Sequence, residues 1–401
     1  MYISKESFKI NNLNIIQFMM SLFVIYSHAF SLGAGTAQGE VIKWLTSERL
    51  SAGSLAVSVL FIVSGYLVSA SYDNSKSAIQ YLKNRIFRIF PGLVAVVILT
   101  ALVLGPCITV LSTEEYYKHP ATWQYLKNIK LYPIHWNLPG VFEHNIYPKS
   151  VNGALWTLPY QFAFYIMVGV LGFLGLLRHK TVSLSCFVAF SYAHLMHLGG
   201  GKLAELTGVL GLNWNQFLYL GMYFSAGMTA YSFRDKLYLS KAGTMASIIL
   251  LLFSWFVAKE FYLSSCVFGT YIILYLAYCT KVVNFPLFGL SFGIYIYSFP
   301  IQQTVTFLFG GIMNPYLNML ISMPIALLFA WLSNKCVERP AMNIKKYISI
   351  KNLIPDSVFT VYEKLYTGWM TLVDRIFAMS WIAFAILVIG AVVMVFVKNG
   401  F

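Results

Sequence analysis

Apolar segments of about 20 residues recur along almost the whole of this 401-residue chain. A segment of that length, wound into an α-helix, is just long enough to cross the hydrocarbon core of a bilayer. Eleven such segments cover residues 12–31, 52–71, 87–111, 154–177, 182–198, 214–231, 242–258, 261–280, 285–309, 315–334 and 378–397. The sequence therefore predicts an all-α fold, a polytopic membrane bundle of ten to eleven transmembrane helices.

Composition and charge agree with a membrane location. Apolar residues make up 58% of the chain and charged residues only 10%, which is outside the range of ordinary soluble domains. The net charge of +14 does not indicate nucleic acid, because the basic residues form short clusters at the ends of apolar segments. These clusters satisfy the positive-inside rule if the N-terminus is cytoplasmic. We expect a multi-pass protein in contact with membrane lipid, with a cytoplasmic N-terminus and no nucleic-acid partner.

The chain divides near residue 350. Residues 1–350 hold the first ten apolar segments and are expected to form one membrane domain. In residues 351–401, Leu365, Trp369 and Leu372 recur at helical spacing, which predicts an amphipathic helix on the membrane surface before the eleventh span. The five cysteines show no short pair spacing, so they indicate neither a disulfide framework nor a metal site.

His28 is the one ionisable side chain well inside the first apolar segment. Ionisable groups at such depth usually face the interior of the bundle or a water-filled cavity. A neutral imidazole there could act as a general base and take a proton from a hydroxyl group. It could equally be a structural histidine that hydrogen-bonds a neighbouring helix, and position alone does not separate the two interpretations.

Arg85 and Arg88 form an Arg-x-x-Arg pair where the third apolar segment begins. Residues three apart share one helix face, so the two guanidinium groups could bind a phosphate-bearing ligand together. A cluster that only follows the positive-inside rule is the alternative interpretation.

The longest predicted outside loop covers residues 112–153. It contains Trp123, Trp136 and Glu143, which could lie at the mouth of a site. The tryptophans could equally belong to an aromatic belt at the membrane surface.

Six stretches along the chain carry a resemblance to a known family. They read, in order, "NNLNIIQFMMSLFVIYSHAFSL", "GSLAVSVLFIVSGYLVSASY", "YLKNRIFRIFPGLVAVVI", "LPGVFEHNIYPKSVNGALWTLPYQFAFY", "LSFGIYIYSFPIQQ" and "CVERPAMNIKK". In this order they resemble the acyltransferase-3 family, in particular its branch that O-acetylates lipopolysaccharide, capsule and related polysaccharides. The resemblance runs from about residue 11 to residue 346 and implies a bacterial cytoplasmic (inner) membrane protein.

The resemblance also implies roles for individual residues. The family's membrane histidine falls on His28, and its Arg-x-x-Arg pair falls on Arg85 and Arg88. The family's "W-[ST]-L" motif falls on Trp156, Thr157 and Leu158, as this chain has them.

The chain departs from the family pattern at two positions. The family usually has arginine eleven residues before the histidine, where this chain has Gln17, and glutamate in the fourth span, where it has Gln161. We expect the two glutamine side chains to hydrogen-bond each other across the helices, or to donate to an oxyanion during catalysis.

The resemblance implies a membrane O-acyltransferase. Acyl-CoA, most simply acetyl-CoA, is the expected donor substrate and is held at Arg85 and Arg88, while His28 activates a hydroxyl of a surface polysaccharide or lipid-linked glycan. The acceptor is expected near Trp156, Tyr160 and Glu143. No permanently bound cofactor and no metal is required. A transporter of glycan intermediates and a catalytically inactive relative that serves as an assembly subunit are the two alternatives.

Overall fold

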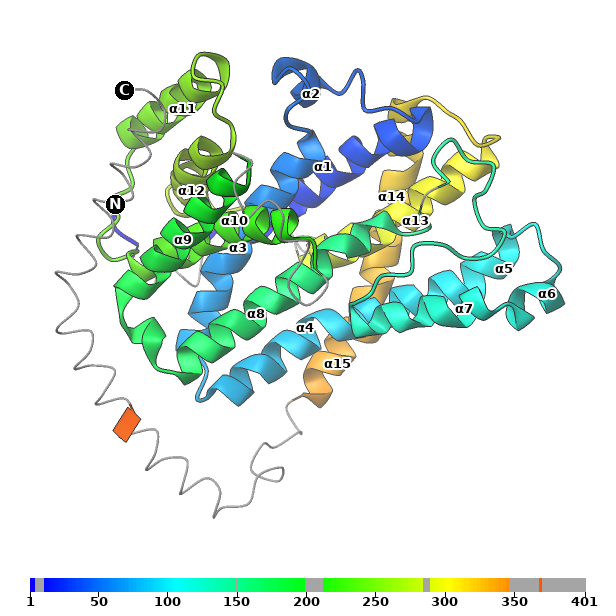
Figure 1. Ribbon diagram of the computed structural model, residues 1–401, viewed down its shortest axis with the longest axis horizontal. Coiled ribbons are helices and arrows are strands. Elements are labelled where there is room, and N and C mark those ends of the chain that lie inside the picture. The colour runs from blue at the N-terminus through cyan, green and yellow to red at the C-terminus, as the bar shows by residue number, and fades with distance from the viewer. Residues whose placement is uncertain (4–10, 149, 199–211, 284–288, 346–367, 370–401) are drawn as a thin grey trace.

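The computed structural model describes residues 1–3, 11–148, 150–198, 212–283, 289–345 and 368–369, and these residues are mainly helical (Figure 1). The described residues contain one isolated β-bridge, between Tyr2 and Tyr238, and no named strand. The prediction of an all-α fold is therefore confirmed. The predicted eleventh span lies outside the described residues, and so does the predicted amphipathic helix, apart from Gly368 and Trp369.

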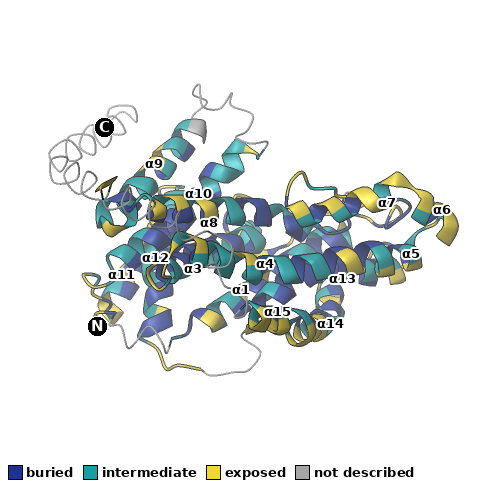
Figure 2. Ribbon diagram, turned by 90° about the horizontal axis from the view of Figure 1, so that it is seen from below, coloured by how far each residue is buried: buried dark blue, intermediate teal, exposed yellow. Residues whose placement is uncertain are grey.

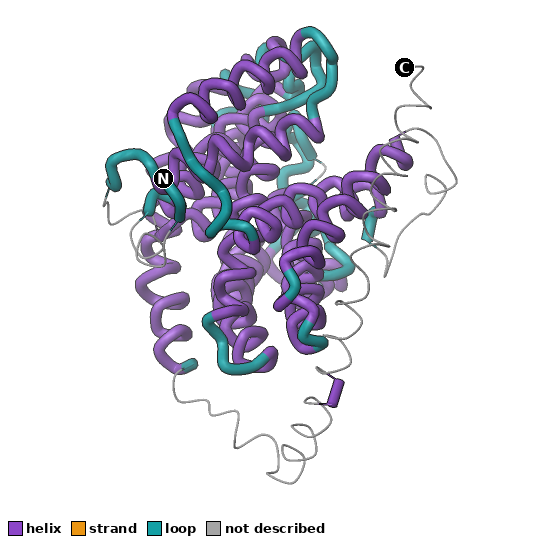
Figure 3. Tube along the Cα trace, turned by 90° about the vertical axis from the view of Figure 1, so that its left-hand side faces the viewer, coloured by secondary structure: helices purple, strands orange, loops and turns teal. Residues whose placement is uncertain are grey.

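The longer helices are arranged as a bundle (Figures 1 and 3). They are α1 (Leu13–Ala34), α3 (Ala52–Asp73), α4 (Ala78–Ile98), α8 (Leu158–Phe173), α9 (Lys180–Leu198), α10 (Trp214–Ser232), α11 (Lys241–Phe256), α12 (Tyr262–Tyr278), α13 (Ser291–Leu308) and α14 (Pro315–Ser333). The short helices are α2 (Val41–Leu45), α5 (Gly105–Ile108), α6 (Thr113–Lys118), α7 (Pro120–Tyr125) and α15 (Arg339–Ile344). We call the end of the bundle where α1 begins the basic end, and the end where α1 stops and α3 starts the loop end.

Each of the first ten predicted segments contains a described helix, but only five described helices are long and apolar enough to span a bilayer. These five are Leu13–Ala34, Ala52–Asp73, Ala78–Ile108, Gly153–Phe173 and Pro315–Ile344. Helices α11 and α12 are apolar but shorter. Large apolar side chains such as Ile249 on α11 and Leu320 on α14 are exposed, as expected for contact with lipid. Figure 2 shows exposed residues on both of these helices.

Helices α3 and α10 approach each other closely at two glycines. A Cβ atom at Gly65 would overlap the carbonyl group of Phe224, and a Cβ atom at Gly227 would overlap the carbonyl group of Ile62. Small residues let membrane helices approach closely and gain van der Waals contact over their length. Helix α10 also packs against α9, while α1 packs against α3, α13 and α14.

Helix α4 begins earlier than the hydropathy pattern predicts. It starts at Ala78, before the apolar segment that begins at residue 87. The Ser77 side chain caps this start by accepting a hydrogen bond from the Gln80 amide at 3.1 Å. Arg85 and Arg88 are therefore about two to three turns inside the helix, and their place at the membrane entry of this span stays a prediction. Hydropathy missed the first turns because Gln80, Lys83 and Asn84 interrupt their apolar side chains.

The predicted loop 112–153 folds back into the bundle in its last part. The Gln303 side chain on α13 donates to the carbonyl oxygens of Tyr147 and Ser150 at 2.7 and 2.9 Å. The side chains of Asn145 and Asn152 donate to the carbonyl oxygens of Gln303 and of Ile296, each at 2.9 Å. Non-helical backbone is tolerated at membrane depth only where protein satisfies its polar groups, and these amide side chains do so.

We expect Gln303→Leu to lower the thermal stability of the detergent-solubilised protein by several degrees. The change leaves two carbonyl groups of the loop without their donor, at a cost of about 1–3 kcal/mol each. The exposed Gln124→Leu is the matched control and should leave the melting temperature unchanged. Equal melting temperatures for the two variants would show that the loop does not depend on Gln303.

Candidate active site

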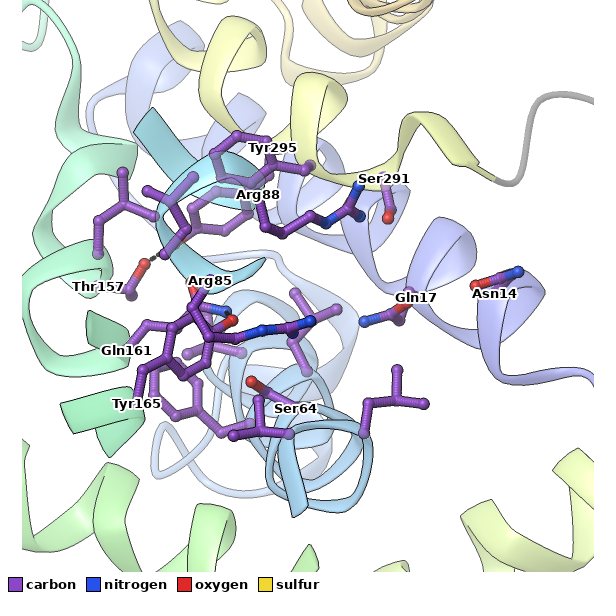
Figure 4. A pocket seen from close by; sticks show the side chains of 18 of the residues that line it. Asn14, Gln17, Ser64, Arg85, Arg88, Thr157, Gln161, Tyr165, Ser291 and Tyr295 are labelled. Carbon is purple, nitrogen blue, oxygen red and sulfur yellow. Dashed lines mark hydrogen bonds between the residues drawn. The ribbon is translucent and has the colours of Figure 1, made fainter. Parts of the chain in front are cut away.

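A cavity of about 510 Å³ lies between α1, α3, α4, α8 and α13. Its polar side chains come from all five helices and from the turn that precedes α8 (Figure 4). They are Asn14, Gln17, Ser64, Arg85, Arg88, Thr157, Gln161, Tyr165, Ser291 and Tyr295. Four of the predicted site residues, Gln17, Arg85, Arg88 and Gln161, are therefore brought together by the tertiary structure.

Arg85 and Arg88 supply the positive charge of this cavity. Both side chains are half-buried, and Figure 4 shows the Arg85 guanidinium extending from α4 toward Gln17 on α1. The Arg85 Cζ atom lies 5.7 Å from the centre of the Tyr165 ring, and its Nε atom is buried with no hydrogen-bond partner among the described residues. An unpaired buried donor is costly unless a ligand satisfies it, so this cavity is suited to an anion.

Arg88 has an electrostatic partner that sequence reasoning missed. Glu338 is 6% exposed and interacts electrostatically with Arg88. It ends a π-helical turn, Asn334–Glu338, between α14 and α15, and such turns are frequent at functional sites. Glu338 stands in the "CVERP" stretch that contributes to the resemblance, which was the one available signal.

The expected hydrogen bond between Gln17 and Gln161 is not formed. The Gln161 Nε2 atom instead donates to the Tyr165 hydroxyl at 2.9 Å, so the side chain bonds one turn along its own helix. The Tyr165 ring also faces Arg85. Gln161 therefore contacts Tyr165, which faces Arg85, and does not hydrogen-bond Gln17, although both glutamines line the cavity.

This arrangement changes what charged substitutions should do. Gln17→Arg adds a third cation to a cavity that already holds Arg85 and Arg88, so we expect it to lower the melting temperature. Gln161→Glu adds an anion beside Arg85, and we expect it to be tolerated and to offset much of the effect of Gln17→Arg in the double variant. A thermal-stability double-mutant cycle measures this coupling. If the effects of the two single changes simply add, the side chains at positions 17 and 161 do not interact electrostatically.

His28 lies outside this cavity. Its ring packs edge-to-face on Phe299 with 5.1 Å between ring centroids, and its Nδ1 atom is buried without a hydrogen-bond partner in the described part of the chain. Phe299 is one helical turn beyond Tyr295, which lines the cavity. Gln17 and His28 face the same side of α1, and eleven residues separate them by ~16 Å. His28 is therefore further along the same helix face, toward the loop end.

The backbone around His28 is held by a buried carboxylate. Glu40 is fully buried, and its carboxylate accepts hydrogen bonds from the Ser27 hydroxyl at 3.0 Å and from the backbone amide of Ala52, the first residue of α3. A negative charge at a helix N-terminus is favourable. Glu40 therefore joins α1 to α3 next to His28, and no local motif in the sequence indicates this contact.

The three predicted acceptor residues are not all together. Trp156 lines a second cavity of about 260 Å³. Tyr160 packs on Trp156 with 5.9 Å between ring centroids, and its hydroxyl accepts a hydrogen bond from the Asn213 amide at 3.1 Å. Glu143 is exposed and lines neither cavity. Among the described residues, no group of three or more His, Cys, Asp or Glu side chains is placed to hold a metal ion.

The structure is thus a helical bundle that encloses a cavity lined by two arginines, with a half-buried histidine further along one of its walls. Comparison with known sequences defines the family. The family model described as an acyltransferase domain matches residues 10–335, so the chain belongs to the acyltransferase-3 family and is an acyltransferase.

Two curated relatives are similar to this chain. One is the "O-acetyl transferase" of Shigella phage Sf6, which is 29% identical over 342 residues, covering 82% of this chain and 96% of that protein. The other is "Nodulation protein 10" of Rhizobium leguminosarum bv. viciae, 29% identical over 166 residues, covering 40% of this chain and 44% of that protein. No solved structure matches the chain.

Proposed function

We propose that this protein transfers an acetyl group from acetyl-CoA to a hydroxyl of a cell-surface glycan. The observation that carries the proposal is the convergence of Arg85 and Arg88 in one polar cavity whose α1 wall continues to His28. Two guanidinium groups suit the phosphates of coenzyme A. The similarity to a phage O-acetyl transferase supports acetyl as the group transferred.

On the donor side, the phosphates of coenzyme A are held at the arginines and its flexible arm extends along α1. Gln17 and Gln161 lie with the arginines and ~16 Å of helix separates Gln17 from His28, so we assign the glutamines to donor binding and not to an oxyanion. If the basic end is cytoplasmic, as the positive-inside rule predicts, the donor is drawn from the cytosol.

At the reacting end, His28 takes the proton of the acceptor hydroxyl as the oxygen attacks the thioester carbonyl carbon. A tetrahedral intermediate forms, the carbon–sulfur bond breaks, and the coenzyme A thiolate leaves and recovers the proton. The unpartnered Nδ1 atom of His28 supports this role, because no hydrogen bond to a described residue fixes its protonation. The acceptor then approaches from the loop end, where Trp156 lies.

The direct test uses purified protein in lipid nanodiscs, isotopically labelled acetyl-CoA and surface polysaccharide from cells that lack the gene. We expect label in the polysaccharide, with an acetyl mass increment that mass spectrometry also finds in cells carrying the gene. A glycan transporter would bind no coenzyme A. An inactive assembly subunit would leave polysaccharide acetylation in cells unchanged when His28 is replaced, so both alternatives are distinguished.

A further inference from the structure

The second cavity lies at the loop end, between the start of α3 and helices α9, α10 and α12. Three of its side chains form an aromatic cluster: His194, Tyr219 and Tyr262 have ring centroids 5.5 to 5.9 Å apart. Trp156 adds a fourth ring to the lining. Aromatic faces beside polar groups suit a flat, amphipathic ligand such as a sugar ring.

Polar groups within this aromatic lining can orient such a ligand. The Tyr219 hydroxyl bonds the Ser58 hydroxyl at 2.7 Å, which fixes its position. The Asn215 Oδ1 atom is buried and has no hydrogen-bond partner among the described residues. A ligand hydroxyl that donates to Asn215 would satisfy this acceptor, whose burial alone is unfavourable.

Arg49 gives the cavity its one formal charge among the described lining residues. One of its guanidinium nitrogens, Nη1, donates to the Lys259 carbonyl at 2.9 Å, and its Cζ atom lies 5.2 Å from the centre of the Phe261 ring. These contacts position the guanidinium but do not neutralise it, since Arg49 forms no ion pair with any described carboxylate. The nearby Glu260 carboxylate already accepts hydrogen bonds from three backbone amides at the start of α12.

The second cavity and the arginine-lined cavity share a wall. Val57 on α3 lines both of them and is 7% exposed. A ligand in the second cavity would therefore lie next to the arginine-lined cavity at the Val57 side chain.

We propose that the second cavity binds the acceptor, and that the acceptor is an anionic glycan whose negative group is held by Arg49. The proposal rests on the acyl-transfer function given above. The aromatic rings contact the sugar, Asn215 accepts one of its hydroxyls, and Arg49 pairs with a carboxylate or a phosphate. Charge-assisted bonds of this kind are among the stronger ones a protein offers.

The test compares wild type with Arg49→Gln in nanodiscs, using three soluble acceptors: a uronic-acid oligosaccharide, its carboxyl-reduced form and a phosphorylated oligosaccharide. We expect Arg49→Gln to raise KM for the charged acceptors a few-fold, up to about fivefold, because Arg49 is exposed before binding and exposed ion pairs are weak. Both kcat and the dissociation constant of coenzyme A should stay unchanged, because Arg49 does not line the arginine-lined cavity. KM for the reduced acceptor should be the same in both proteins. The charged acceptor whose KM rises more in Arg49→Gln shows whether the anionic group is a carboxylate or a phosphate.

Lys127→Gln, an exposed change in the loop 112–153, is the matched control and should alter no constant. Asn215→Ala should raise KM for charged and reduced acceptors alike. An unchanged KM in Arg49→Gln, or an equal rise for the reduced acceptor, would overturn the anionic-glycan assignment while leaving acetyl transfer intact. Absence of transfer by the wild-type protein to any acceptor would instead refute the proposed function itself.

Discussion

Replacement of His28 by alanine should abolish acyl transfer, lowering kcat at least a hundredfold, while expression and membrane insertion stay near normal. General-base catalysis contributes about 10²–10⁴-fold, and no other described imidazole packs beside Phe299. The fold should tolerate the change, because it removes a polar side chain from a membrane helix and leaves no new group unpaired. The measurement is labelled acetyl incorporation into polysaccharide.

His144→Ala is the matched control for this change, since His144 is exposed in the loop 112–153 and should be dispensable. The dissociation constant of coenzyme A should be the same for wild type and for both variants, because His28 lies ~16 Å along α1 from Gln17 in the donor cavity. Undiminished acetylation by the His28→Ala protein would exclude the general-base role.

Replacement of Arg85 and Arg88 together by glutamine should weaken coenzyme A binding about tenfold or more for each arginine. Hydrogen bonds to charged groups contribute about 1.5–3 kcal/mol, and both side chains face one cavity. Acceptor binding should be unaffected. Isothermal titration of coenzyme A into the solubilised protein measures the loss, with Lys76→Gln, an exposed change just before α4, as control.

Stability must be separated from binding in this experiment. Arg88 interacts electrostatically with the buried Glu338, so Arg88→Gln alone removes a favourable interaction and should also lower the melting temperature. Adding Glu338→Gln should restore stability but not coenzyme A affinity. If donor affinity is unchanged in the Arg85 and Arg88 variants, the two arginines do not bind the donor and only follow the positive-inside rule.

Much of the fold could be predicted because its causes are local. The length of an apolar segment needed to cross a bilayer is fixed by bilayer thickness, and the first ten predicted segments each contain a described helix. Hydropathy alone failed at α4, because a Ser77 cap and first turns that mix polar with apolar residues extend the helix beyond the apolar segment. It also failed for the end of the loop 112–153, which is held in the bundle by Gln303, about 150 residues further along the chain.

The candidate site also depends partly on the local sequence and partly on contacts between distant residues. By itself, the sequence determined which residue types are available: a histidine inside the first apolar segment, an Arg-x-x-Arg pair on one helix face, and two glutamines, Gln17 and Gln161. The three-residue spacing of Arg85 and Arg88 was sufficient to place them on one side of α4, since helical geometry relates such positions.

Only the tertiary structure decided which of these groups meet. It placed Gln17 and Gln161 with the arginines, brought Glu338 from a distant helix into electrostatic interaction with Arg88, and left His28 outside the arginine-lined cavity. It also created the second cavity from helices separated by more than 100 residues. The physical reason is that cavities and ion pairs arise from helix packing, which depends on long-range contacts that no local pattern of residues records.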